Sequence, residues 1–229
     1  MKFVSKAIIA GAFVGGPSVA TAQELEGYAG VAISNAYVSQ GLNYNEAPTV
    51  QPYIELGYGG FYGGIWTSNA DADLLGDSRE VDYYVGYRGS AGPVSYDLQY
   101  ALYTFTADDF EEFDFELPDY SEFIASASYG VTDALFVTGR VGYAPEVDDG
   151  EGTVVAVTDL SLSTEYYFDS LTASASYGTI DDESDGWEYW SVGFSTYVSD
   201  GAYVSLDYID SSIQDSTILV TYGIDFSLL

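Results

Sequence analysis

Carboxylates are the main chemically active groups that this sequence offers. The 229 residues include 36 Asp and Glu against 5 Lys and Arg, and there is no Cys or His. Disulfides, zinc sites of the usual ligand type and Ser-His or Cys-His catalytic pairs are therefore excluded. Nucleic acid is excluded as a partner because it requires a basic face. The chemistry that remains is the binding or electrostatic attraction of cations, and acid–base work by paired carboxylates.

One set of carboxylates recurs at the same parity within segments that alternate apolar and polar residues. We interpret this parity as the inner face of a closed sheet. The residues predicted to line a cation-selecting lumen are Glu55, Asp82, Asp97, Arg140, Glu165 and Asp207, and Asp225 shares their parity. Rings of carboxylates between low-dielectric walls favour cations over anions. The alternative is that these groups, with inward Tyr84 and Tyr103, form a hydrogen-bonded plug.

A second set of carboxylates lies between the alternating segments. Oxygen-rich clusters bind hard cations such as calcium or magnesium. Two acidic runs are therefore candidate sites for a loosely bound divalent cation, Asp148, Asp149 and Glu151 in the first and Asp181, Asp182 and Asp185 in the second. Neither has the spacing of a recognised calcium loop, and no resident cofactor is expected. The alternative is that these acids are solvated, and repel other proteins or bridge to lipopolysaccharide through shared divalent ions.

About twelve segments of strand length follow Glu26, each alternating apolar with small or polar residues. The clearest runs from Pro93 to Phe105, where Leu98 lies on the apolar face and Asp97 on the polar face. Such period-two alternation is typical of β-strands. The 23 Tyr and 25 Gly match membrane barrels, which carry aromatic girdles at both interfaces. We predict an all-β fold, a transmembrane antiparallel up-and-down β-barrel of about 12 strands.

The connections between the segments alternate in length, which predicts the topology. Tight turns rich in Gly, Asp and Ser are expected at residues 58–60, 88–93, 130–133, 168–170 and 199–201. Longer links are expected at residues 40–48, 70–78, 106–119, 144–152, 181–186 and 210–215. Short turns at one end and long loops at the other form the outer-membrane pattern, with both termini on the periplasmic side. A soluble β-sandwich would instead need an apolar interior.

The link at residues 106–120 leaves the state of the lumen open. Its phenylalanines alternate with acids at nearly every other position. A segment of this kind either folds inward as a constriction or lies outside as an amphipathic surface. Strand number does not decide between an open and a filled lumen, because about twelve strands is intermediate between filled small barrels and open porins.

The first 22 residues have the composition of a secretory signal peptide. Two lysines flank the start, an apolar run follows at residues 7–14, and Ala20-Thr21-Ala22 forms a small-x-small cleavage site. The apolar run is shorter than the roughly 20 residues that a membrane-spanning helix requires. We therefore predict a signal peptide at residues 1–22 and a mature outer-membrane β-barrel domain at residues 23–229.

The C-terminal residues form an amphipathic last strand with a further signal. The string from Thr221 to Leu228 resembles the closing-strand signal that the outer-membrane barrel assembly machinery reads, which has a polar residue, a Gly two later and spaced apolar residues near the end. The residues that carry this resemblance are Thr221, Gly223, Phe226 and Leu228. The extra Leu229 is a departure, because such strands more often end on an aromatic residue.

The stretch from Tyr37 to Phe105 carries a family likeness. Tyr37-Val38-Ser39-Gln40-Gly41 is followed by Pro48-Thr49-Val50-Gln51-Pro52, by an aromatic segment ending in Trp66-Thr67-Ser68-Asn69, and by Glu80-Val81-Asp82-Tyr83-Tyr84. This order resembles the TorF-type porin family of proteobacteria over about the first third of the mature chain. The resemblance implies an outer-membrane barrel with a channel role. Family members often have an Arg where this sequence has Gln40, so the departure argues against the handling of anions.

These predictions lead to one functional hypothesis and one alternative. We expect export through the periplasm to the bacterial outer membrane, with lipid, lipopolysaccharide and the barrel assembly machinery as partners. The leading hypothesis is a porin-like channel for passive diffusion of small hydrophilic solutes, preferably cationic or neutral. The alternative is a non-conducting structural or adhesive barrel whose acidic loops bind divalent cations or partners. An enzyme is not expected because no activated nucleophile can be named, and the oligomeric state is open.

Overall fold

The computed structural model describes residues 25–71, 79–106, 120–148, 154–182 and 186–229. The predicted signal peptide and residues 107–119 of the phenylalanine-rich link lie outside this part of the chain. The strands are β1 (Leu25–Ser34), β2 (Tyr37–Ser39), β3 (Leu42–Asn45), β4 (Thr49–Tyr58), β5 (Phe61–Asn69), β6 (Arg79–Ala91), β7 (Val94–Thr106), β8 (Tyr120–Gly130), β9 (Leu135–Asp148), β10 (Val154–Tyr167), β11 (Thr172–Asp181), β12 (Trp187–Ser199), β13 (Ala202–Ser211) and β14 (Thr217–Ser227). Over these ranges, no helix is long and apolar enough to cross a membrane.

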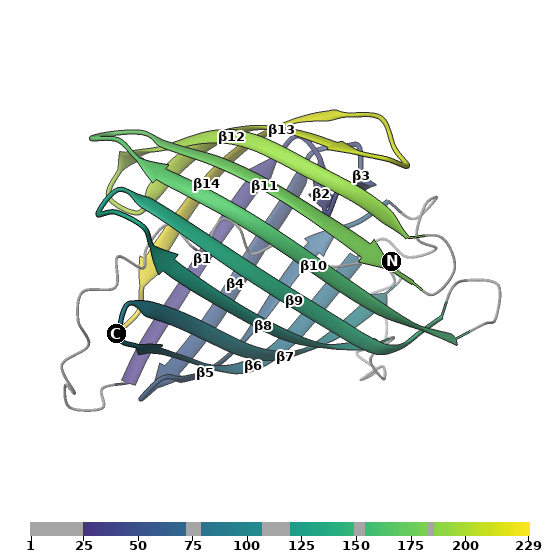
Figure 1. Cartoon of the computed structure of the whole chain (residues 1–229), viewed down its shortest axis with the longest axis horizontal. Helices are drawn as coiled ribbons and strands as arrows, with labels where there is room; N and C mark the ends of the chain where they lie inside the picture. The colour runs from purple at the N-terminus through teal and green to yellow at the C-terminus, as the bar shows by residue number, and fades with distance from the viewer. Residues whose placement is uncertain (1–24, 72–78, 107–119, 149–153, 183–185) are drawn as a thin grey trace.

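Twelve of the strands form one closed barrel, in which every neighbouring pair is antiparallel (Figure 1). From β4 to β14 each strand pairs with the next in sequence, and β1 closes the ring between β14 and β4. Tyr28 of β1, for example, pairs with Glu55 on one side and Ser227 on the other. The predicted all-β barrel of about 12 strands is confirmed.

The register preserves one parity around the whole barrel. In β7, Leu98 on the predicted apolar face is 52% exposed, whereas Tyr103 on the opposite face is 2% exposed. The outer surface carries large apolar side chains, among them Ile54, Leu56 and Tyr58. An apolar exterior around a polar and aromatic interior inverts the arrangement of a soluble sandwich.

Short turns join the strands at one end of the barrel. Gly59 and Gly60, between β4 and β5, have φ of 60° and 90°, which suits a two-residue hairpin turn. The predicted turn at residues 88–93 is wrong in its extent, because β6 continues to Ala91 and only Gly92 and Pro93 connect it to β7. Arg88 therefore lies in a strand and pairs with Asp97. The sequence pattern misassigned it because the Gly and Ser residues that follow it are ordinary turn formers.

The link between β1 and β4 contains a second, smaller element. The sequence predicts a long link at residues 40–48, but β2 and β3 pair there as a two-stranded hairpin separate from the barrel sheet. Gln40 and Gly41 connect them with φ of 49° and 76°. Positive φ at both central residues is what a type I′ hairpin turn requires. The hairpin residues Tyr37 and Tyr44 are 3% and 2% exposed, so the hairpin packs inside the barrel.

Candidate functional site

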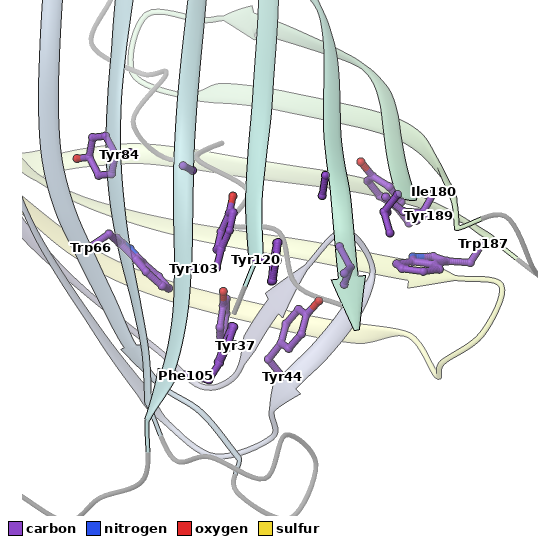
Figure 2. Close-up of a cluster of buried hydrophobic side chains, with 14 of the residues drawn as sticks. Tyr37, Tyr44, Trp66, Tyr84, Tyr103, Phe105, Tyr120, Ile180, Trp187 and Tyr189 are labelled. Atoms are coloured by element: carbon purple, nitrogen blue, oxygen red, sulfur yellow. The ribbon is translucent and has the colours of Figure 1, made fainter. Parts of the chain in front are cut away.

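The lumen has two unlike walls. The aromatic wall consists of large inward side chains of β4–β8, namely Tyr53, Tyr62, Trp66, Tyr84, Tyr103 and Tyr120, and most of them are buried. The serine wall consists of small inward side chains of β10–β13, namely Ser161, Ser163, Ser174, Ser176, Ser191, Ser195 and Ser205, and all of them are partly exposed. Figure 2 shows Tyr37 and Tyr44 of the hairpin in one cluster with Trp66, Tyr103 and Tyr120.

Arg140 is the centre of one charged cluster. Its guanidinium contacts Asp159 of β10 and lies 3.2 Å from Glu122 of β8. Both carboxylates are fully buried, and each accepts a further hydrogen bond, Glu122 from the Tyr103 hydroxyl at 2.8 Å and Asp159 from the Tyr189 hydroxyl at 2.9 Å. A buried ion pair of this kind stabilises only when further hydrogen bonds satisfy the remaining polar atoms, as they do here.

Arg88 is the centre of a second charged cluster, nearer the turn end of the barrel. Its guanidinium lies 2.9 Å from Glu55 of β4 and 3.9 Å from Asp97 of β7. The guanidinium carbon also stacks 3.8 Å from the centre of the Tyr62 ring, and the Tyr62 hydroxyl donates to Asp97. The cation is therefore held by two carboxylates and one aromatic face.

Three inward carboxylates accept hydrogen bonds from hydroxyl groups. Asp207 accepts from Ser205 at 2.9 Å, Asp225 from Tyr53 at 3.0 Å, and Glu165 from Tyr167 at 3.0 Å. A Cβ built on Gly193 of β12 would collide with Asp207, so the glycine leaves room for this carboxylate at the serine wall. No arginine contact is recorded for these three carboxylates in the described part of the chain, so their charge is not neutralised locally.

The predicted lumen residues all have inward parity, but they do not form one ring. Glu55 and Asp97 share Arg88, whereas Arg140 belongs to the other cluster, and Asp207 lies at the serine wall. Asp82 is buried in the aromatic wall, where it pairs with Trp66 and Tyr103 in register. Their role in cation selection remains a prediction.

The predicted lumen residues did not include the charged cluster members Arg88, Glu122 and Asp159, or Gln40, which contacts Asp159. The parity of β6 would have placed Arg88 on the inward face that also carries Asp82, had the strand been extended past Tyr87. Glu122 and Asp159 carry the same alternation signal as the predicted acids. Gln40 was noted as standing where an Arg is common, and the structure places it buried in the lumen, where its amide nitrogen donates to Asp159 at 3.0 Å.

The predicted divalent-cation residues lie only partly in the described chain. Asp181 ends β11, and the Asp182 carboxylate accepts from the backbone of Gly186 at 3.1 Å. The side chain of Asp148 and the whole of Asp149, Glu151 and Asp185 lie outside the described residues. Within the described part, no group of three or more acidic residues is placed to hold a metal ion. Divalent binding by these runs remains a prediction.

The residues of the assembly signal lie on the strand that closes the barrel. Thr221 and Gly223 face inward and pair with Ser34 and Ala32 of β1, while Phe226 and Leu228 are exposed on the outer surface. A Cβ on Gly223 would collide with the ring of Tyr203, so this position has a packing role of its own. Recognition by the assembly machinery remains a prediction.

The sequence matches a family model over residues 20–227, described as a bacterial protein of unknown function, Gcw_chp. The chain belongs to the Gcw_chp family. The resemblance to TorF-type porins is more specific than this family match, which does not test it, and it remains a prediction. No curated protein matches the sequence of this Gcw_chp member.

Several solved structures resemble the Gcw_chp barrel. The KdgM porin superposes with a TM-score of 0.58 at 12% identity, over 90% of this chain and 100% of that one. The NanC porin superposes with a TM-score of 0.55 at 11% identity, over 86% of this chain and 97% of that one. An outer membrane channel from Pseudomonas putida F1 superposes with a TM-score of 0.50 at 8% identity, over 93% of this chain and 100% of that one. KdgM has also been solved in complex with disordered oligogalacturonate. At these identities the likeness shows that the Gcw_chp chain shares the porin fold.

Proposed function

We propose that this protein is a channel of the bacterial outer membrane for passive diffusion of small hydrophilic solutes, cationic or neutral. The observation that carries the proposal is the excess of carboxylates over arginines on the inner face of a closed barrel. The inward carboxylates include Glu55, Glu80, Asp82, Asp97, Glu122, Asp159, Glu165, Asp207 and Asp225, and they face Arg88 and Arg140. Carboxylates within a low-dielectric wall concentrate cations and repel anions.

The two arginines support this preference because both are already paired. Arg88 lies between Glu55 and Asp97, and Arg140 lies between Glu122 and Asp159. An anionic solute would have to displace these carboxylates before it could use either guanidinium. We therefore do not extend to this chain the oligogalacturonate of the KdgM complex, even though the fold is shared.

The serine wall is the route that we propose for the solute. Its side chains are partly exposed, whereas most of the aromatic wall is buried. Hydroxyl groups can replace the hydration of a passing solute. Asp207, which accepts a hydrogen bond from Ser205 of this wall, adds a negative charge to the route. The resemblance of Tyr37 to Phe105 to TorF-type porins supports the same channel role.

Single-channel recording of the refolded mature protein in a planar bilayer under a salt gradient tests this function. We expect discrete conductance steps with a reversal potential on the cation side. Asp207→Asn should move the reversal potential toward zero, because it removes a carboxylate that has no arginine contact. Asp169→Asn, in the exposed turn between β10 and β11, makes the same charge change outside the lumen and should leave the reversal potential unchanged.

Two results would contradict the proposal. Equal reversal potentials in the wild type and Asp207→Asn would remove the carboxylate from the selectivity assignment. A properly folded barrel that is silent in the bilayer would favour the alternative, a structural or adhesive barrel whose loops bind divalent cations or partners. The observation that supports this alternative is the hairpin, because it occupies part of the barrel interior.

A further inference from the structure

We propose that the β2–β3 hairpin is the constriction of this channel, held in place by the contact between Gln40 and Asp159. The inference rests on the channel function proposed above. It assigns the size limit for solutes in that channel to one structural element. The sequence left open whether the link at residues 106–120 folds inward or lies outside. The element that the structure describes within the lumen comes instead from the first link of the barrel.

The side chain at the tip of the hairpin reaches the opposite side of the lumen. The hairpin is connected to β1 and β4, and its tip reaches β10, where the amide nitrogen of Gln40 lies 3.0 Å from the Asp159 carboxylate. β10 is six strands away from β4 in either direction around the ring of twelve, so the two strands are diametrically opposite. A solute that enters from the loop end must therefore pass beside the hairpin.

The tip of the hairpin is closely fitted to the far wall. The Trp187 indole donates to the carbonyl oxygen of Gln40 at 2.9 Å. A Cβ built on Gly41 would lie 2.6 Å from the Cβ of Tyr189 and 2.7 Å from the Cβ of Ser211, closer than real side chains approach. Only glycine therefore allows the tip to lie this near to β12 and β13.

The base of the hairpin is packed against the near wall. The ring of Tyr37 lies 5.7 Å from that of Trp66 in β5 and 5.1 Å from that of Tyr44 in β3. On the third side, the backbone nitrogen of Asn43 donates to the Gln214 side chain at 2.6 Å. Contacts with both walls and with the link after β13 fix the position of the hairpin inside the barrel.

The backbone at Gln40 indicates that this position is constrained. Among the described residues, Gln40 is the one non-glycine residue with positive φ, at 49°. Such a conformation is strained for an L-residue and persists where surrounding contacts fix it. Asn, Asp or Gly would be more usual at this position of the turn. The longer Gln side chain instead reaches the buried carboxylate of Asp159.

The tip also lies on the proposed solute route. Asp159 and Tyr189 precede Ser161 and Ser191 by two residues, on the same inward parity, at the loop end of the serine wall. A solute that follows the serine wall therefore meets Gln40 and Gly41. The free space beside the hairpin would set the largest solute that passes.

Replacement of residues 36–47 by a short Gly-Ser link tests the constriction directly. Conductance and exclusion of neutral polyethylene glycols of graded mass would be measured for the wild type and the variant in planar bilayers. We expect conductance to rise by at least about two-fold and the size limit to increase, because both follow the free cross-section. Heat-modifiable electrophoretic mobility checks that each barrel is folded.

Two point substitutions test the constriction if the variant with the Gly-Ser link does not fold. Gln40→Gly keeps the positive-φ turn and removes the side chain that contacts Asp159, and it should raise the size limit by a smaller step. Gly41→Leu should displace the tip, because a side chain there collides with Tyr189 and Ser211. Gly139→Leu is the matched control, because a Cβ there meets nothing within 4 Å and points out of the barrel.

The outcomes separate this inference from the channel function. If the wild type conducts and the three hairpin variants keep its conductance and size limit, the constriction is disproved and the channel function stands. If the wild type does not conduct and the hairpin variants do, the result supports the hairpin as the element that closes the lumen. The same result contradicts the proposal that the wild type is a passive channel. If all folded forms are silent, both proposals are overturned.

Discussion

The aromatic wall and the serine wall belong to the same closed sheet but fill the lumen in opposite ways. On the aromatic wall, large rings cover the strands and each arginine is paired with two carboxylates. On the serine wall, small hydroxyl side chains remain partly exposed, and Ser176 and Ser191 bond to each other at 2.7 Å. The comparison shows that side-chain volume, and not strand number alone, determines how completely the inner face of a twelve-stranded barrel is covered.

Glycine and tyrosine act together on the inner face. A Cβ added at Gly64 would collide with the Tyr84 ring, and one added at Gly86 would collide with the Tyr62 ring. The hydroxyl end of each tyrosine therefore lies over a glycine of the neighbouring strand. Gly178 and Gly223 stand in the same relation to Tyr189 and Tyr203. This packing gives a structural reason for a chain that is rich in both residues.

The largest expected effect on stability comes from the arginine that joins the two walls. Arg140→Met leaves the fully buried Glu122 and Asp159 without their cation. Removal of one partner of a buried ion pair costs about 3–5 kcal/mol. Urea-induced unfolding of the barrel in lipid vesicles would measure the free energy of unfolding. A loss below about 1 kcal/mol would mean that the carboxylates hydrate or protonate without strain, and the contrast between the walls would weaken.

A smaller effect is expected from crowding of the aromatic wall. Gly86→Ala places a methyl group against the Tyr62 ring and 2.7 Å from the Leu98 carbonyl oxygen. Overpacking of this kind costs about 1–3 kcal/mol. Gly139→Ala is the control on the outer face, where a Cβ meets nothing within 4 Å. Equal unfolding free energies for the two variants would contradict the packing of tyrosine on glycine.

The smallest effect is expected on the serine wall. Ser191→Ala removes the hydrogen bond with Ser176, but both side chains are partly exposed. Water can replace the lost partner, so the free energy of unfolding should fall by no more than about 0.5–1 kcal/mol. The same urea titration would measure it. A loss as large as that of Gly86→Ala would indicate that the serine wall is as tightly packed as the aromatic one.

The alternation along each strand was enough to predict the barrel and its two faces. Residues such as Leu98 and Asp97 could be assigned correctly because side chains alternate strictly across a strand. Arg88 was misplaced because the Gly and Ser residues after it have the local preferences of a turn. Pairing with β7 over the full length of β6 overrides those preferences.

The sequence by itself determined the all-β class, the strand parity, the acidic inner face and the position of most short turns, since these depend on neighbours along one strand. Only the tertiary structure decided which carboxylates share Arg88 and Arg140, because those partners come from different strands and meet through the register of the closed ring. It also decided the inward fold of the hairpin. The residues that fix Gln40 and Gly41, among them Asp159 and Tyr189, lie more than a hundred positions away along the chain.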